Sequence, residues 1–289
     1  MVMKKVFWII LCMFFIPLVT FAGNMKLHYD RPAEYFEEAL VIGNGTMGAT
    51  LYGGVKKDKI SFNDITLWTG EPESENSSPD AFNVIPEIRA LLDNEDYEGA
   101  DKAQYKVQGH YSENYQPLGT LTIEYLDDTA GISDYHRWLD IGNATARTQY
   151  LKDGKLFTSD YFASAPDSVI VIRLKSENKE GIHALLSFDS PLPHSSQVAD
   201  NEISVEGYAA YHSFPVYYKA EDKHRYDPER GIHFKTLVRV LSVDGSVKNR
   251  YSDSRIEIDG STEVLILIAN VTSFNGFDKD PVKEGRNYR

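Results

Sequence analysis

Apolar and polar residues alternate along most of the chain after Tyr115, and this alternation restricts the fold more than any other feature. The segment TLTIEYL at 120–126 shows it most clearly. Successive side chains of a β-strand point to opposite faces of a sheet, so a period of two predicts strands with one buried face. Further strands are predicted at 135–141, 144–150, 155–163, 169–174, 184–189, 203–208, 232–244, 255–259 and 264–272. Turns at 178–181, 200–202, Asp244-Gly245 and Asp259-Gly260 separate several of them. About eleven such strands predict a mainly β protein, a large antiparallel β-sandwich.

A glycine-rich stretch precedes this region. Glu38–Gly70 reads EALVIGNGTMGATLYGGVKKDKISFNDITLWTG. Its short apolar runs predict paired antiparallel strands at Gly48–Gly54 and Lys59–Asn63, with VKKDK as the hairpin connection. GNGTMG at 43–48 lacks the Gly-Lys-Ser/Thr end of a phosphate-binding loop and precedes a strand, so we interpret it as turn and bulge geometry rather than a nucleotide site.

The second of these strands is followed by a polar and aromatic segment that an ordinary hairpin does not need. Asn63, Asp64, Thr66 and Trp68 lie in it and are the candidate site residues. In one interpretation, Trp68 stacks on a sugar ring while the three polar side chains bind hydroxyl groups or hold the loop. In the other, which we favour for the domain by itself, Trp68 fills part of a core and the polar groups cap turns.

A helical region interrupts the strand pattern. Residues 83–94 place Val84, Ile88 and two leucines on one helical face, and Tyr97–Val107 continues with a similar period. Asp96 stands where it can cap the second helix. The sequence therefore predicts a helical hairpin inserted into the β domain.

Residues 1–22 have the pattern of a secretory signal peptide. Lys4 and Lys5 form a basic region, Val6–Phe21 is apolar, and a small residue marks a cleavage site near Ala22. A membrane anchor is the alternative interpretation, but the apolar run is short for a membrane span and Pro17 interrupts it. We expect a secreted or periplasmic protein with no membrane attachment after cleavage.

Charge and cysteine content exclude several classes of partner. The chain carries a formal net charge of −13 at pH 7 without basic clusters, which argues against nucleic acid as a partner. Cys12 is the only cysteine and lies in the segment expected to be removed, and the eight histidines do not have metal-ligand spacing. We therefore predict no metal, no cofactor, and a fold held together by its core rather than by disulfides.

Carboxylates are plentiful, but the sequence does not pair them for catalysis. A glycoside hydrolase needs two carboxyl groups placed across one sugar. Asp64, Glu71, Asp140, Asp160 and Asp167 are candidates, and each is more simply explained as a surface or turn residue. No Gly-x-Ser-x-Gly nucleophile motif is present. We assign no catalytic residue in this chain.

Several motifs carry a family resemblance. The stretch EALVIGNGTMGATLYGGVKKDKISFNDITLWTGEP resembles the opening of glycoside hydrolase family 95, the α-L-fucosidases and α-L-galactosidases. Further matching segments follow in order: IPEIRALLDNEDYEGAD, YQPLGTLTIEY, YHRWLDIGNATARTQY, FTSDYFASAPDSVIVIRL and LILIANVTSFNGFDKDP. The resemblance covers Met25–Pro281. Val41, Thr46-Met47 and Phe62–Ile65 depart from the family's usual pattern.

The resemblance implies a β-supersandwich at the N-terminus of a longer enzyme whose catalytic unit is an (α/α)6 barrel. In the family, a glutamic acid acts as general acid and an aspartate activates water, and both lie in the barrel, so neither maps onto this chain. The sandwich is then expected at 25–274, and 275–289 is the start of a linker to a missing catalytic domain. That domain is the implied partner, with a fucosylated glycan as substrate of the full enzyme. Asn63–Trp68 would form a domain-interface loop.

Three functional hypotheses result. The first is the N-terminal domain of a secreted α-L-fucosidase-like hydrolase, inactive by itself. The second is a stand-alone carbohydrate-binding module, which Trp68, Trp138 and the 18 tyrosines would suit. The third is a structural domain that only supports its neighbour.

Overall fold

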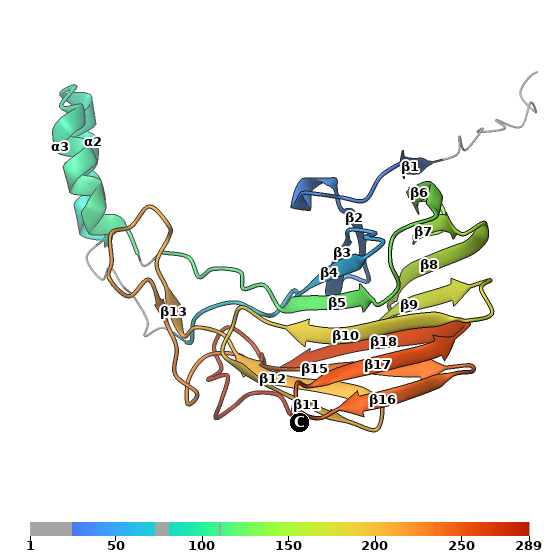
Figure 1. The fold of residues 1–289 in the computed structure, drawn as a ribbon. Helices are drawn as coiled ribbons and strands as arrows, with labels where there is room; N and C mark the ends of the chain where they lie inside the picture. Colours follow the sequence, from blue (N-terminus) through green and yellow to red (C-terminus); the bar gives the residue numbers. More distant parts are fainter. Residues whose placement is uncertain (1–24, 73–80, 110, 289) are drawn as a thin grey trace, which may run out of the picture.

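The computed structural model describes residues 25–72, 81–109 and 111–288. Two large antiparallel β-sheets lie face to face across a continuous apolar core (Figure 1). The expected mainly β sandwich is confirmed. The predicted signal peptide at 1–22 lies outside the described residues.

Among the described residues, nine strands form the larger sheet, and every neighbouring pair is antiparallel. The central pair runs from Phe234 opposite Thr272 to Ser242 opposite Val264. In spatial order the strands are β1 (Lys26–Tyr29), β6 (Ile132–Asp140), β7 (Thr145–Lys152), β8 (Lys155–Ser164), β9 (Val169–Ser176), β18 (Glu263–Thr272), β15 (His233–Ser242), β12 (Glu202–Tyr208) and β11 (His194–Ala199).

The smaller sheet has seven antiparallel strands within the same described ranges. A two-stranded ribbon lies in the loop between β12 and β15, and a short 3-10 helix, η1 (Phe36–Glu38), leads into the first strand of this sheet. The ribbon strands are β13 (His212–Ser213) and β14 (His224–Arg225). The sheet order is β16 (Ser246–Arg250), β17 (Arg255–Ser261), β10 (Ile182–Asp189), β5 (Gly119–Tyr125), β4 (Lys57–Asp64), β3 (Met47–Leu51) and β2 (Leu40–Gly43).

Strand β4 brings polar groups as well as apolar ones into the core. Its inward side chains are Asp58, Ile60, Phe62 and Asp64, none more than 3% exposed. The two apolar side chains fill the middle of the sandwich, and a carboxylate is buried near each end of the strand. From a rise of about 3.3 Å per residue, the two carboxylates stand roughly 20 Å apart along the strand. They mark the two ends of the sandwich.

The predicted helical hairpin is confirmed. It consists of α2 (Ala81–Asp93) and α3 (Tyr97–Gln104), continued by a 3-10 turn, η2 (Tyr105–Val107). The carboxylate of Asp96 caps α3 by accepting a hydrogen bond of 2.9 Å from the Gly99 amide. The two helices pack on each other and project away from both sheets (Figure 1). No helix in the described part of the chain is long and apolar enough to cross a membrane.

Some local predictions differ from the structure. The sequence pattern does not predict β11 or β16, because the segments HSSQVA and SVKNR lack an alternating apolar face. The predicted turn at Asp259-Gly260 is wrong. Gly260 lies inside β17 with a φ of 75°, and the register shifts between Ile182 and His183 on β10. This glycine forms a β-bulge, and the chain changes sheets at Thr262.

Candidate functional site

Asp64 ends β4 and uses both carboxylate oxygens inside the sandwich. Its Oδ1 atom accepts hydrogen bonds from the Thr66 amide at 2.9 Å and the Thr66 hydroxyl at 2.6 Å. Its Oδ2 atom accepts one from Nδ2 of Asn270 at 2.9 Å. Asn270 lies on β18 in the opposite sheet, so this carboxylate links the two sheets. At 2% exposure, Asp64 presents almost no surface to a ligand.

Hydroxyl groups extend this network. The Thr236 hydroxyl donates to Oδ1 of Asn270 at 2.8 Å, which fixes the orientation of the amide. The Thr66 and Thr272 hydroxyls lie 2.5 Å apart. The loop that follows β4 is therefore anchored to β18 at two points. Buried networks whose members are all satisfied hold their elements in one arrangement.

Trp68 is the exposed member of the predicted set. Its indole is 42% exposed, and Nε1 donates to the carbonyl of Ile65 at 2.9 Å. The ring meets Tyr115 edge to face with centroids 6.2 Å apart, and the two backbones form an isolated β-bridge. Burial, together with the charge of Asp64, raises the pKa of Tyr115 above its ordinary value, so this phenol stays neutral. Trp68 is held in place while part of its ring remains open.

The open side of this loop forms one wall of a groove of about 310 Å3, and the segment after β18 forms the other. We call it the Trp68 groove. Its main apolar side chains are Ile65, Trp68, Phe274, Phe277 and Pro281. Phe277 is 90% exposed. A contiguous exposed apolar surface with aromatic rings is typical of a ligand or partner site.

The polar groups beside the groove are already paired. Arg230 donates two hydrogen bonds to the Glu71 carboxylate, one of them 2.9 Å long, and its guanidinium lies 3.6 Å from the centre of the Tyr211 ring. The hydrogen bond to Glu71 raises the pKa of Arg230 further above its usual range. The Thr69 hydroxyl donates to Glu113. The acidic side chains that line the groove are thus engaged, which favours binding over acid–base catalysis.

The structure brings only part of the predicted set to the groove. Thr66 and Trp68 line it, whereas Asp64 lies beneath it in the core. Asn63 is half-buried beside Gly48, where an added Cβ would lie 2.6 Å from Oδ1 of the asparagine. The sequence reasoning missed Phe277, and the signal that could have found it is an aromatic residue in an otherwise polar tail.

The remaining candidate carboxylates have local partners. Asp140 bonds to Asn143 and pairs with Lys26, Asp160 pairs with Arg147, and Asp167 accepts from Ser164. Within the described ranges, no group of three or more His, Cys, Asp or Glu side chains is arranged to hold a metal ion.

A family model described as "Glycosyl hydrolase family 65, N-terminal domain" matches residues 27–276. "Alpha-L-fucosidase 2" of Arabidopsis thaliana is 28% identical over 259 residues, which cover 87% of this chain and 31% of that protein. Two proteins named "Probable alpha-fucosidase A" also match. The one from Aspergillus niger is 28% identical over 273 residues, which cover 88% of this chain and 31% of that protein. The one from Aspergillus oryzae is 23% identical over 248 residues, which cover 83% of this chain and 32% of that protein. The chain spans about a third of the length of these curated relatives.

Proposed function

This chain belongs to the family of glycosyl hydrolase family 65 N-terminal domains, and from that premise we propose that it is the non-catalytic N-terminal β-sandwich of a secreted α-L-fucosidase-like hydrolase. The pattern of similarity carries the proposal. Proteins named as α-fucosidases match 83% to 88% of this chain, while the chain covers only 31% or 32% of each of them. Catalysis then belongs to the part of the enzyme outside the match. Its substrate is a glycan with terminal α-L-fucosyl or related L-sugar groups.

The Trp68 groove supports a role in contacting that catalytic region. It exposes the Trp68 and Phe277 rings, while Glu71 and Glu113 beside it are already bound by neighbours. Polar groups that are satisfied within the domain cost little when a partner covers them. We propose that Asn63–Trp68 faces the catalytic region across this groove.

The first test is an activity measurement. The purified chain is expected to give no turnover of an aryl α-L-fucoside above the rate without protein, because catalysis belongs to the part of the enzyme outside the match. Turnover that copurifies with the chain would overturn the assignment as non-catalytic. The gene downstream of codon 289 is expected to encode a helical-repeat catalytic region, and a reading frame without one would contradict the proposed role.

A stand-alone carbohydrate-binding module is the second candidate, and the exposed Trp68 ring is the observation that favours it. If it is correct, fucosylated oligosaccharides bind the isolated chain saturably and Trp68→Ala abolishes the binding. Tyr226→Ala is the matched control, since Tyr226 is 40% exposed and does not line the groove. Absence of binding to the wild-type chain would remove this candidate and leave the docking role.

A further inference from the structure

A second cavity lies at the other end of the sandwich, near the start of β4. It has a volume of about 250 Å3, roughly that of eight water molecules. The loop after β5, the hairpin between β9 and β10, and the end of β7 surround it. We call it the Tyr150 cavity. The lining side chains used below are Asp127, Tyr150, Lys152, Phe157 and Glu180.

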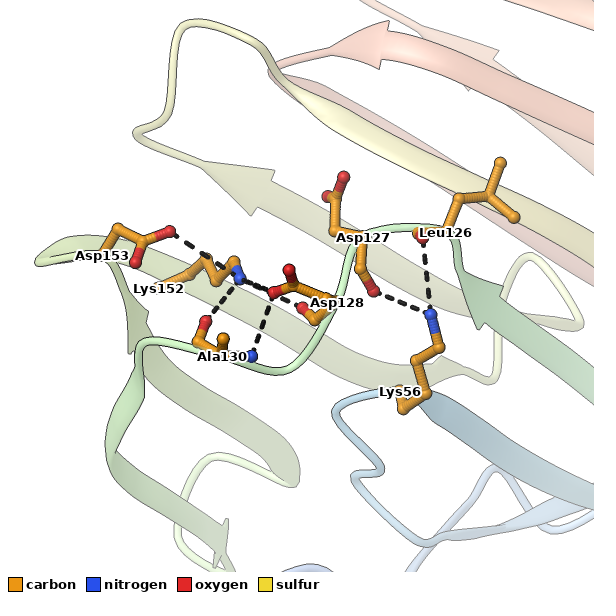
Figure 2. A network of polar contacts seen from close by, with 7 residues as sticks. All are labelled: Lys56, Leu126, Asp127, Asp128, Ala130, Lys152 and Asp153. Carbon is orange, nitrogen blue, oxygen red and sulfur yellow. Dashed lines mark hydrogen bonds and ion pairs between the residues drawn. The ribbon is translucent and has the colours of Figure 1, made fainter.

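Two lysines hold the loop that forms one wall of this cavity, as Figure 2 shows. Lys56 donates to the carbonyls of Leu126 and Asp127, the latter at 2.8 Å. Lys152 donates to the carbonyl and carboxylate of Asp128, at 3.0 and 2.8 Å, and to the carbonyl of Ala130 at 2.5 Å. The ammonium of Lys152 therefore donates three hydrogen bonds to the loop. The wall is preformed, and this lysine is structural.

Tyr150 lines this cavity with a hydroxyl that the fold does not use. The side chain is 5% exposed, and its ring is stacked between Phe157 at 4.8 Å and Tyr135 at 6.4 Å. Its hydroxyl makes no hydrogen bond with any residue in the described part of the chain. Burial raises its pKa well above the ordinary value, so it remains a phenol that can donate.

Two exposed acidic residues, Asp127 and Glu180, line the same cavity. Neither Asp127 nor Glu180 forms an ion pair or accepts a hydrogen bond through its side chain among the described residues, although both line the cavity. The charge of Asp127 contributes to the raised pKa of Tyr150, so the two groups lie near each other. In Figure 2 the Asp127 carboxylate points away from Lys56. The cavity is thus lined by two acceptors and one donor that have no side-chain partner within the described ranges.

We propose that the Tyr150 cavity binds a single neutral sugar residue. Sugar hydroxyls donate to the carboxylates of Asp127 and Glu180, and one of them accepts from the Tyr150 hydroxyl. The edge of Phe157 provides an apolar wall for the C–H groups of the ring. A volume of about 250 Å3 admits one sugar ring but not a longer oligosaccharide in full. This site lies at the opposite end of β4 from the Trp68 groove, and the proposal does not depend on the proposed function.

The test measures binding of L-fucose, D-galactose and D-glucose to the full chain by titration calorimetry and ligand-observed NMR. At least one of them is expected to bind saturably. Tyr150→Phe keeps the stacked ring and removes the hydroxyl, and should weaken binding about fivefold. Asp127→Asn removes a charged acceptor and should weaken it about tenfold or more. Trp68→Ala should leave this binding unchanged.

Tyr135→Phe is the matched control for the phenol. The Tyr135 hydroxyl donates to the Gly53 carbonyl at 2.7 Å and does not line the cavity. This variant should lower the melting temperature and bind sugar as wild type does, whereas Tyr150→Phe should bind more weakly without losing stability.

Three outcomes would overturn the proposal. The first is that none of the three sugars binds saturably. The second is that Tyr150→Phe and Asp127→Asn both bind as wild type does. The third is that ethanolamine, as a small cation, binds at the cavity while no sugar competes with it. None of these outcomes bears on docking at the groove or on the sequence downstream of codon 289, so the proposed role as a non-catalytic N-terminal domain stands or falls separately.

Discussion

Asp58 and Asp64 are buried by the same strand, but their surroundings differ. Asp64 receives three hydrogen bonds from Thr66 and Asn270. Asp58 lies within the core, where the Tyr161 hydroxyl donates to it at 2.7 Å and the Gly54 amide at 2.9 Å. Burial raises the pKa of Asp58 to about 6, an effect that these hydrogen bonds only partly offset.

Asp58→Asn is expected to change how stability depends on pH. The pKa of Asp58 is about 6 in the folded chain and about 3.9 in the unfolded chain. Between these values the folded chain holds a proton that the unfolded chain has released, so the contribution of Asp58 to stability falls as pH rises and stays low above pH 6. Asparagine resembles the protonated acid. The free energy of unfolding of the variant, relative to wild type, should therefore rise by about 2 kcal/mol between pH 4 and pH 7 in urea titrations.

Asp244→Asn provides a control of opposite sign. Asp244 is exposed, and hydrogen bonds from Thr262 lower its pKa, so its contribution to stability grows with rising pH. Its removal should make the variant less stable, relative to wild type, at pH 7 than at pH 4. An equal difference from wild type at both pH values for Asp58→Asn would show that the buried carboxyl does not titrate as expected.

Asp64→Ala is expected to lower the free energy of unfolding by about 2 to 4 kcal/mol, because it leaves buried donors on Thr66 and Asn270 without an acceptor. Asn63→Ala, one position away and half-buried, should cost less than about 1 kcal/mol. Urea unfolding of both variants measures the contrast. If the two variants lose equal stability, the network at Asp64 does not hold the loop.

Residue-level placement was partly readable from the sequence. Counting by two from Ile60 and Phe62 puts Asp64 on the inward face of β4, so its burial follows from local pattern. The pairing of Asp64 with Asn270 does not follow from local pattern, because 206 positions separate the two residues. Trp68 is a candidate site residue from the sequence, but the groove it lines depends on Phe277, which folding brings opposite it.

At the scale of elements, local signals succeeded where an element is defined by its own residues. The α2–α3 hairpin has a helical period and a cap, and the central strands alternate cleanly, so both were predictable. The edge strands β11 and β16 were not, because their polar side chains form strands through pairing with neighbours. A glycine after an aspartate equally suits a turn or a bulge, and only the register of β17 against β10 distinguishes them.

The helical hairpin is expected to lose stability independently of the sandwich. Asp96→Ala removes the cap of α3 and should lower the protection of the α3 amides against hydrogen exchange by about 1 kcal/mol. Because α2 buries no residue and the hairpin projects from the sheets, the melting temperature of the sandwich should stay unchanged. Glu98→Gln, which leaves the cap in place, is the control. A drop in the melting temperature with Asp96→Ala would show that the hairpin is coupled to the core.

At the scale of the whole molecule, the sheet assignment was the least predictable feature. Consecutive strands β17 and β18 lie in different sheets although only Thr262 separates them, and β9 pairs with β18 across much of the chain. Alternation shows that one face of a strand is buried, but it does not show to which of the two sheets the strand belongs. The resulting sandwich has two chemically distinct ends, the Trp68 groove and the Tyr150 cavity, separated by the length of β4.

We propose that residues 1–22 are removed when the protein is secreted. Strand β1 begins at Lys26, opposite Asp140 on β6. Cleavage after Ala22 therefore leaves the nine-stranded sheet intact, and loss of Lys4 and Lys5 changes the formal net charge from −13 to −15. Expression of the full coding sequence in a bacterial host should yield a periplasmic protein whose N-terminus is Gly23, measured by intact mass and N-terminal sequencing. Ala22→Arg should block cleavage and leave the precursor in the membrane fraction. Recovery of the wild-type chain from the cytoplasm with residues 1–22 attached would contradict the proposal.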